Sequence, residues 1–594
     1  MPGFIGQIGN TDIRLAEETR KDLVQSWLTA DGSYQFHQRT IDKFLGDKLF
    51  VDTDRYLLII DGVVLNNRAL MQQYNAISWQ NCVVAMYEQL GDTFYLPWRG
   101  SFCGLLYDKQ EDKWLLFTNH VGDKQLFYAP TSSGCLVSTE MDCLVRTMKL
   151  SQLPLTLNRD AVYFTLTHGF MIEDHTIAQE IKKIPAGHYL RIQNGKFELI
   201  QYHRFTNKPN HDLTHEEAIK RIDQLFCNAV QLQFEKDKEY GYKHLTCLSG
   251  GLDSRMTVWV AHQMGYTEQL NTTFSESGYL DFSIAQQIAT DLRHDFIFKA
   301  LDGGECIKDL EHITPITYGQ TCYFGLAHGN RLFESLNFEP YGIMHTGMVG
   351  DAILGTFFKK MAYNPEYKVG QGAYSQELIE RLSDYTFQQV YENEEIFCLY
   401  TRGFSGANAG MTSFQRFTET CSPFCDVDFI EFCYSLPIEW RFGHKIYFDW
   451  ILDCYPEAAE YVWEKIKRKI TRFENRQERK IKVFGYEIPH WTERSFRPWL
   501  KGSILRRLGL RKKSGKTKAP QVFTKWNMNP VDYWFCINPS LAEFANNYYR
   551  NNIIDIEDNQ LRTDIEDLYN KTTIYDKIQA ISIISAIKLL SEND

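Results

Sequence analysis

Short runs of hydrophobic residues, separated by turn residues, dominate roughly the first third of the chain. Such runs are typical of β-strands. The clearest are RYLLIID (55–61), SFCGLLYD (101–108), KWLLFTNH (113–120), QLFYAP (125–130) and HYLRIQ (188–193). A few helical stretches intervene, such as residues 80–90. We therefore predict an α+β domain built on antiparallel sheet over residues 1–205.

The hydrophobic pattern changes near Thr214. Residues 214–234 place apolar side chains at helical spacing, and Thr214 with Glu217 predicts a capping box at the start of that helix. The strand-like runs HLTCL (244–248), LNTTF (270–274) and DFIFKA (295–300) then alternate with helical patterns. This alternation predicts an α/β domain with a parallel sheet and extra helices over residues 206–594.

Composition and charge limit the classes of function. The chain has 594 residues and a net charge of −11, which suits a globular protein of two or more domains and argues against a nucleic-acid binder. It shows neither a signal peptide nor an apolar run long enough for a membrane span. The 14 cysteines form no CxxC pair, which favours reduced thiols in a cytoplasm. The basic stretch at residues 494–518 is typical of a flexible surface loop.

The most informative motif is SGGLDS (249–254), which lies between the strand at 244–248 and the following helix. Glycines let a ligand approach the backbone, and a helix N-terminus attracts phosphate. Asp253 beside a bound polyphosphate would require a bridging cation such as Mg²⁺. Because no lysine follows the glycines, this is not the phosphate loop of kinases and GTPases. The alternative is a glycine-rich turn without a ligand.

The motif resembles the pyrophosphate-binding loop of enzymes that split ATP into AMP and pyrophosphate. Further segments occur in the order and spacing of asparagine synthetases, from residue 1 to about 460. These are DGVVLNNRAL (61–70), WRGSFCGLLYD (98–108), NHVGDKQLFYA (119–129), STEMDCL (138–144), EIKKIPAGHYL (180–190), TGMVGDAILG (346–355) and ETCSPFCDVDFIEFCYSLP (419–437). The resemblance implies a four-layer αββα glutamine amidotransferase-like domain followed by an ATP-binding synthetase domain.

The resemblance also implies roles for the matching residues. The phosphates of ATP and Mg²⁺ would be held by Ser249, Gly250, Gly251, Asp253 and Ser254. Asp351 would be the second carboxylate on the metal. The adenosine would be bordered by Leu248, Phe274 and Gly347.

Three further residues match family positions closer to the chemistry. Lys445 would neutralise charge that develops on the phosphates. Asp281 and Glu419 match carboxylates near the substrate. Three of the matching residues have a simpler interpretation as well: Lys445 as a solvated lysine, Asp281 as a helix cap, and Asp351 as a turn residue.

The sequence departs from the family in the glutaminase pocket. Active relatives begin Met-Cys-Gly, whereas Pro2 here has no thiol to attack glutamine. Asp61 replaces an amide of the oxyanion hole, and its charge would repel a developing anion. Val63 and Arg99 replace carboxylates that hold the amino group of the substrate. We predict that the first domain keeps its fold and does not hydrolyse glutamine.

The synthetase half also departs from the family. Met348 stands where relatives carry a glutamate or a tyrosine that handles the substrate amine, and Ala352 replaces a carboxylate. His345 is close enough in sequence to serve instead. Three functions stay open: a ligase that adenylates a carboxylate, including a lactam- or lasso-peptide-type cyclase; asparagine synthesis from aspartate; and a non-catalytic ATP-binding scaffold. The acid would be a small molecule, sugar-linked or peptidic. The nitrogen would come from free ammonia, a partner glutaminase or the amine of the substrate itself.

Overall fold

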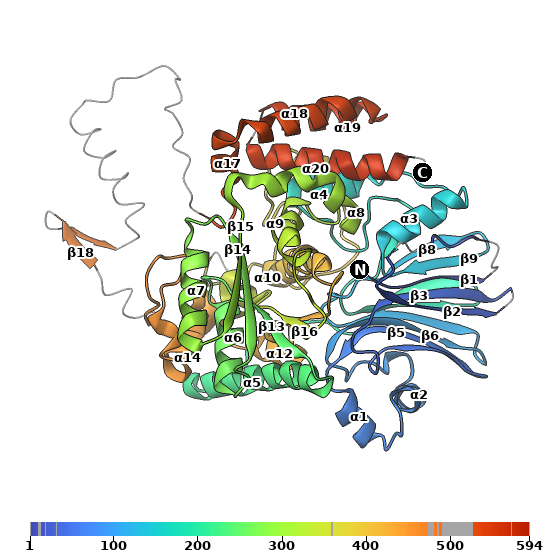
Figure 1. The fold of residues 1–594 in the computed structure, drawn as a ribbon, viewed down its shortest axis with the longest axis horizontal. Helices are drawn as coiled ribbons and strands as arrows, with labels where there is room; N and C mark the ends of the chain where they lie inside the picture. The colour runs from blue at the N-terminus through green and yellow to red at the C-terminus, as the bar shows by residue number, and fades with distance from the viewer. Residues whose placement is uncertain are drawn as a thin grey trace.

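The computed structural model describes residues 2–9, 13–17, 20–30, 32–357, 360–472, 480–483, 486–489, 527–571 and 573–592. Stacked antiparallel sheets form one end of the molecule, and a parallel sheet surrounded by helices forms the other (Figure 1). The basic stretch at 494–518 lies outside the described residues. A small hairpin, β18 (Lys480–Val483) and β19 (Tyr486–Pro489), is described apart from the main body of the fold.

The N-terminal region contains two six-stranded sheets. The first has the order β10 (Lys182–Lys183), β8 (Phe127–Thr131), β9 (Gly134–Ser138), β1 (Gly3–Gly9), β3 (Tyr34–Ile41), β2 (Leu23–Ala30). The second has the order β12 (Lys196–Gln201), β11 (His188–Gln193), β7 (Lys113–Thr118), β6 (Gly100–Asp108), β5 (Tyr56–Val64), β4 (Leu49–Asp52). All neighbouring strands are antiparallel, as the hydrophobic pattern predicts.

Helices cover both outer faces of the paired sheets. Helices α1 (Asn67–Gln73) and α2 (Trp79–Leu90) pack on the second sheet through Leu70, Val83 and Met86. Between the sheets, Phe36 of the first packs in one core with Leu105 of the second. Helices α3 (Met141–Leu150) and α4 (Arg159–His168) cover the outer face of the first sheet. This is the four-layer αββα arrangement expected from the sequence.

The C-terminal region contains a five-stranded parallel sheet. Its order is β15 (Asp295–Ala300), β14 (Gln269–Ser275), β13 (Lys243–Cys247), β16 (Tyr341–His345), β17 (Thr420–Cys421). One core contains α5 (His215–Glu239), α6 (Asp253–Gln263), α7 (Leu280–Leu292), α12 (Val427–Tyr434) and α14 (Lys445–Cys454). The predicted capping box of Thr214 and Glu217 is present at the start of α5. The predicted strand–helix alternation and parallel sheet are confirmed.

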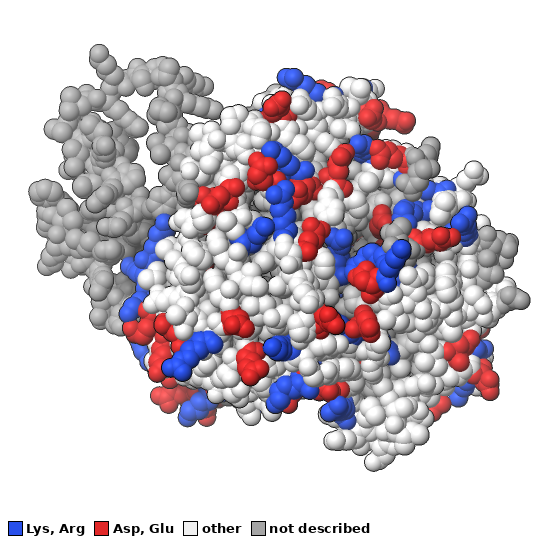
Figure 2. Space-filling model, in the orientation of Figure 1, with Lys and Arg blue, Asp and Glu red and all other residues white. Residues whose placement is uncertain are grey.

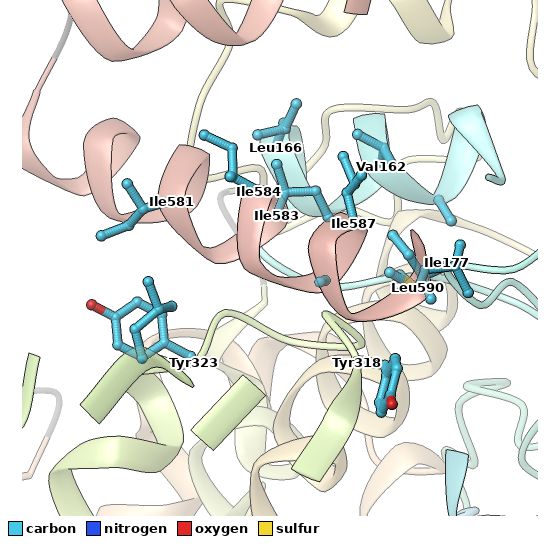
Figure 3. Close-up of a cluster of buried hydrophobic side chains, with 14 of the residues drawn as sticks. Val162, Leu166, Ile177, Tyr318, Tyr323, Ile581, Ile583, Ile584, Ile587 and Leu590 are labelled. Carbon is cyan, nitrogen blue, oxygen red and sulfur yellow. The ribbon is translucent and has the colours of Figure 1, made fainter. Parts of the chain in front are cut away.

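The chain returns at its end to the middle of the molecule. Helices α17 (Val531–Ile537), α18 (Pro539–Asn552) and α19 (Asn559–Lys571) precede α20 (Ile574–Ser591). In Figure 3, α20 lies between α4, which carries Val162 and Leu166, and the tyrosines Tyr318 and Tyr323. The side chains of α20 that point into this cluster include Ile583 and Ile587. Because α20 is packed against both regions, α3 and α4 share their core with the C-terminal helices.

Neither sign of charge dominates the described residues on the face shown in Figure 2. Acidic and basic side chains are interspersed over the face shown in Figure 2. None of the helices in the described part of the chain is long and apolar enough to cross a membrane. All 14 cysteines are unpaired.

Candidate nucleotide-binding and ligase site

The loop after β13 leads directly into α6. Its backbone N–H groups are already hydrogen-bonded within the protein. The N–H of Gly250 donates to Oδ1 of Asp281 at 2.8 Å, and the N–H of Ser249 donates to Oγ of Ser254 at 3.0 Å. The N–H of Gly251 donates to Oγ of Ser249 at 3.2 Å. In this arrangement, oxygens of neighbouring side chains accept all three N–H groups. An anion would have to displace the carboxylate of Asp281 to bind the N–H of Gly250.

Two carboxylates meet at the start of α6. The side chain of Asp253 accepts the N–H of Asp351 at 2.9 Å and the hydroxyl of Tyr447 at 2.7 Å. Burial, together with the negative charge of Asp351, raises the pKa of Asp253 to about 7. Lys465 pairs with the second carboxylate: its Nζ lies 3.8 Å from Oδ2 of Asp351. The site thus holds more negative than positive charge.

Glycines allow the loop after β16 to approach the start of α6. A Cβ at Gly347 would lie 2.3 Å from the backbone nitrogen of Ser254, and a Cβ at Gly350 would lie 2.6 Å from Cγ of Asp253. Between them, Val349 has a φ of 58°, which is strained for a β-branched residue. The backbone is therefore shaped to place Asp351 against Asp253.

Two cavities open on this carboxylate pair. The first has a volume of about 440 Å³ and extends from Asp253 and Asp351 to α9 (Phe324–Phe333) and α20. The second, of about 390 Å³, is bordered by Gly251, Asp281, His444, Tyr447, Lys465 and other residues. Asp253 and Asp351 line both cavities. Ligands bound in the two cavities would therefore both lie beside this carboxylate pair.

The remaining predicted residues lie at different distances from these cavities. Lys445 is the first residue of α14, directly after His444 and two residues before Tyr447, both of which line the second cavity. Phe274 stacks on His328, with ring centroids 5.0 Å apart, near the end of β14. The side chain of Leu248 is buried in the core, so only its backbone at the end of β13 could border a ligand.

Glu419 does not reach either cavity. It is fully buried, 2.7 Å from Nζ of Lys124 and 3.1 Å from Nζ of Lys48. Asp61 completes this cluster: it pairs with Lys124 at 2.8 Å and accepts the hydroxyl of Thr40 at 2.5 Å. Burial raises the pKa of Asp61, but Lys124 and Lys48 outweigh it, and the net direction is downward. Glu419 therefore joins the N-terminal sheets to the parallel sheet, which differs from the expected contact with substrate.

The other departures in the N-terminal pocket have structural consequences. Asp61 is buried and paired with Lys48 and Lys124. Because these lysines neutralise its charge, Asp61 is not the free anion that was expected to repel a developing negative charge. Val63 is fully buried, and Arg99 pairs with Asp428 at 2.9 Å. The cavity beside Arg99 is only about 30 Å³, room for about two water molecules. Pro2 is buried next to the start of β1.

His345 does not take the place of a polar residue at 348. It is fully buried, with Nε2 2.7 Å from Oδ2 of Asp237, and its ring stacks on Phe234. Met348 and Ala352 both line the first cavity. The interpretation of His345 as a substitute is wrong because its side chain points toward α5 and away from the cavity.

Several residues that line the cavities were not predicted from the sequence: Tyr447, Trp463, Lys465 and Gln579. The last three lie beyond about residue 460, where the family resemblance ends. Arg255 is fully buried and donates to the carbonyl of Gly250 at 3.1 Å and to that of Val462 at 2.8 Å. Its guanidinium thereby ties the glycine-rich loop to the segment that carries Lys465. Of these residues, Tyr447 could have been found from the sequence, because it lies two positions after Lys445.

The residues present fit a magnesium–nucleotide complex. Hard oxygen ligands suit Mg²⁺, and the pair of Asp253 and Asp351 supplies them in excess of nearby cations. The absence of side chains at Gly347 and Gly350 lets their loop pack directly against Ser254 and Asp253, beside the carboxylates.

Comparison with known proteins gives matches in both regions. The glutamine amidotransferase domain family matches residues 42–203, and the asparagine synthase family matches residues 221–324. Asparagine synthetase B (glutamine-hydrolyzing) of Escherichia coli is 24% identical over 292 residues, which are 44% of this chain and 45% of that protein. Amidase chyE of Penicillium rubens is 24% identical over 221 residues, 35% of this chain and 31% of that protein.

The matches are partial in length. The matched stretches span less than half of each of these relatives. The solved structure of glutamine phosphoribosylpyrophosphate amidotransferase from B. subtilis, complexed with ADP and GMP, covers 51% of this chain and 85% of that chain. Its sequence identity is 10% and its TM-score is 0.24.

Proposed function

We infer that this chain, which belongs to the asparagine synthetase-like family, is an ATP-dependent ligase that forms an amide bond. A carboxylate oxygen of the substrate attacks the α-phosphorus of ATP, the bond to the β-phosphate oxygen breaks, and pyrophosphate leaves. The nitrogen of ammonia or an amine then attacks the acyl carbon and loses a proton to solvent, and AMP departs. The observation that carries the proposal is the carboxylate pair of Asp253 and Asp351, with a cavity on each side.

We assign the parts of the site accordingly. The loop at 249–254 holds the phosphates, with Asp253 and Asp351 as ligands of Mg²⁺. When bound, the metal neutralises the phosphates and draws charge toward the departing pyrophosphate. Lys445 and Lys465 supply cations on the same side, and Leu248, Phe274 and Gly347 border the adenosine. Asp281 controls the N–H of Gly250, which it accepts in this structure and releases to phosphate.

We propose that the nitrogen does not come from glutamine hydrolysed within this chain. The division at residues 205 and 206 would then separate a structural amidotransferase-like domain from the catalytic one. Pro2 supplies no thiol, and Asp61 is held by Lys48 and Lys124. Free ammonia, a partner glutaminase or an amine of the substrate would serve instead. Asparagine formation from aspartate is less well supported, because Met348 offers no polar contact to an amine.

The direct test is acid-dependent release of pyrophosphate from Mg²⁺ and ATP. The full chain is mixed with a panel of carboxylic acids and ammonium chloride, and pyrophosphate, AMP and amide are measured together. Stoichiometric amide and pyrophosphate are expected with at least one acid. Binding of ATP with no pyrophosphate from any acid would favour the non-catalytic scaffold. Incubation with glutamine alone should yield no glutamate.

A further inference from the structure

The first cavity is walled by aromatic rings from distant parts of the chain. Its large side chains are Phe170, Phe324, Phe357, Tyr374 and Tyr575. Phe324 and Tyr575 meet edge to face, with ring centroids 5.9 Å apart. A cavity of about 440 Å³ is within the range of small-molecule sites. The wall is therefore suited to an apolar body with flat faces.

One of these rings is open on the cavity rim. Tyr374 is 67% exposed, although it lines the cavity. A Cβ at Gly169 would approach its ring to 2.7 Å, so the ring rests directly on the backbone there. One side of the ring rests on the backbone, and the other side is open to a flat group of a ligand. Aromatic pairs of this kind contribute more free energy than burial of their area alone.

Another part of the lining is built from small residues. Gly403, Gly406 and Ala407 line the cavity from the π-helix at Leu399–Ala407. Phe170 packs directly on this wall, because a Cβ at Gly406 would lie 2.8 Å from its ring. Met348 adds a further apolar surface beside Asp351. Aromatic rings and small residues together therefore form most of the apolar lining of this cavity.

The cavity contains one cationic side chain among the described residues that line it. Arg402 is exposed and has no ion-pair partner within the described part of the chain. The acidic groups on the same wall, Asp253 and Asp351, would repel a carboxylate that entered alone. A guanidinium presents paired donors that match a carboxylate.

We propose that the substrate is a carboxylic acid with an apolar, ring-containing body, whose carboxylate pairs with Arg402 while its ring lies against Tyr374. The inference rests on the proposed function, because it takes the first cavity as the acid site. Aspartate and other small polar acids fit poorly, since they leave the aromatic wall uncovered and bring a second charge. Arg402 offsets the repulsion by Asp253 and Asp351 before the oxygen attacks phosphorus.

The first experiment measures binding, which needs no turnover. Phenylacetate, cinnamate, indole-3-acetate, acetate and aspartate are titrated into the full chain with Mg²⁺ and a non-hydrolysable ATP analogue, and heats are recorded. Ring-containing acids should bind at least about tenfold more tightly than acetate or aspartate. Preference for aspartate, or equal binding of all five acids, would overturn the inference.

Matched variants separate the ring contact from the ion pair. Tyr374→Ala should weaken binding of the ring-containing acids and leave acetate unchanged, whereas Phe197→Ala, an exposed ring on β12, should change neither. Arg402→Gln should weaken phenylacetate about tenfold without affecting phenylacetamide, which lacks the charge. Arg221→Gln on α5 is the control for loss of a surface guanidinium.

Turnover then distinguishes the two proposals. Ring-containing acids that bind and also elicit pyrophosphate support both. Ring-containing acids that bind without eliciting pyrophosphate contradict the ligase and leave the cavity assignment standing. Pyrophosphate that appears only with aspartate supports the ligase and overturns the substrate class.

Discussion

The two regions of this protein surround their paired carboxylates in opposite ways. At the junction of the N-terminal sheets with the parallel sheet, Asp61 and Glu419 are paired with Lys48 and Lys124. At the start of α6, Asp253 faces Asp351, and the partly exposed Lys465 pairs with Asp351. The first arrangement is neutral and closed. The second carries excess negative charge and opens on two cavities.

The difference shows where a ligand is needed. Buried charges that are paired within the protein need no ligand to neutralise them, and removal of one partner lowers the stability of the fold. Carboxylates held together without enough cations are electrostatically unfavourable unless a metal binds. The N-terminal cluster is a closed structural contact, while the C-terminal pair has the charge pattern that is typical of functional sites.

The strongest test of the closed arrangement is Lys124→Met. Asp61 and Glu419 would share Lys48 alone, and the uncompensated buried charge should lower the free energy of unfolding by about 3–5 kcal/mol. Equilibrium unfolding in urea measures the change. The double variant Lys124→Met/Glu419→Gln, which removes one charge of each sign, should recover part of the loss. Lys113→Met, at a partly exposed pair with Asp92, should cost less than about 1 kcal/mol. Equal losses for Lys124→Met and Lys113→Met would contradict the comparison.

The open arrangement is tested by Asp351→Asn. Loss of a metal ligand should reduce pyrophosphate release by about 100-fold, because a bound metal stabilises the departing charge by several kcal/mol. Stability should stay the same or rise, since the repulsion of Asp253 is relieved. Asp160→Asn, an exposed carboxylate in the first turn of α4, is the control. A variant that is both fully active and destabilised would show that Asp351 is structural.

Asp426 tests whether a raised pKa alone marks a ligand site. Burial, with the nearby charge of Asp428, raises the pKa of Asp426 to about 6. Its side chain caps α12 by accepting the N–H of Phe429. Because the folded state holds this proton more tightly than the unfolded state, the contribution of Asp426 to stability falls as pH rises from about 4 to about 6.

Asp426→Asn keeps the cap and removes that charge. It should raise the free energy of unfolding by about 1–2 kcal/mol at pH 7.5 and by almost nothing near pH 3. Pyrophosphate release should be unchanged. Urea unfolding at the two pH values measures the gain, and a loss of activity would place Asp426 at a functional site.

The smallest effect is expected from Pro2→Cys. A thiol at this position should not restore glutamine hydrolysis, because Asp61 and Val63 remain buried and Arg99 stays paired with Asp428. Glutamate release from glutamine is the measurement. Turnover in this variant would mean that only the nucleophile had been lost.

Much of the architecture could be predicted because local patterns carry it. The strand–helix alternation after Thr214 placed β13, α6, β14, α7 and β15 in order, and the capping box marked the start of α5. The motif at 249–254 drew attention to Asp253. Its matching partner Asp351 could be inferred only from the resemblance, since 98 positions separate the two residues.

The pairing of the carboxyl groups could not be predicted in the same way. Glu419 was expected to contact substrate because it matches a family carboxylate, yet this residue, which directly precedes β17, pairs with Lys48 and Lys124. The wall formed by Phe170, Phe324, Tyr374 and Tyr575 comes from segments with no common motif. Local sequence patterns do not predict which side chains come into contact when the residues lie far apart in the sequence.

The sequence by itself determined the order of strands and helices, the phosphate-loop motif and the absence of a thiol at position 2. These are properties of neighbouring residues, and they follow from periodicity and side-chain chemistry. Only the tertiary structure decided which charges are neutralised and which are left facing a cavity. That outcome depends on packing between distant segments, because the energy of a buried carboxylate is set by the groups around it in space.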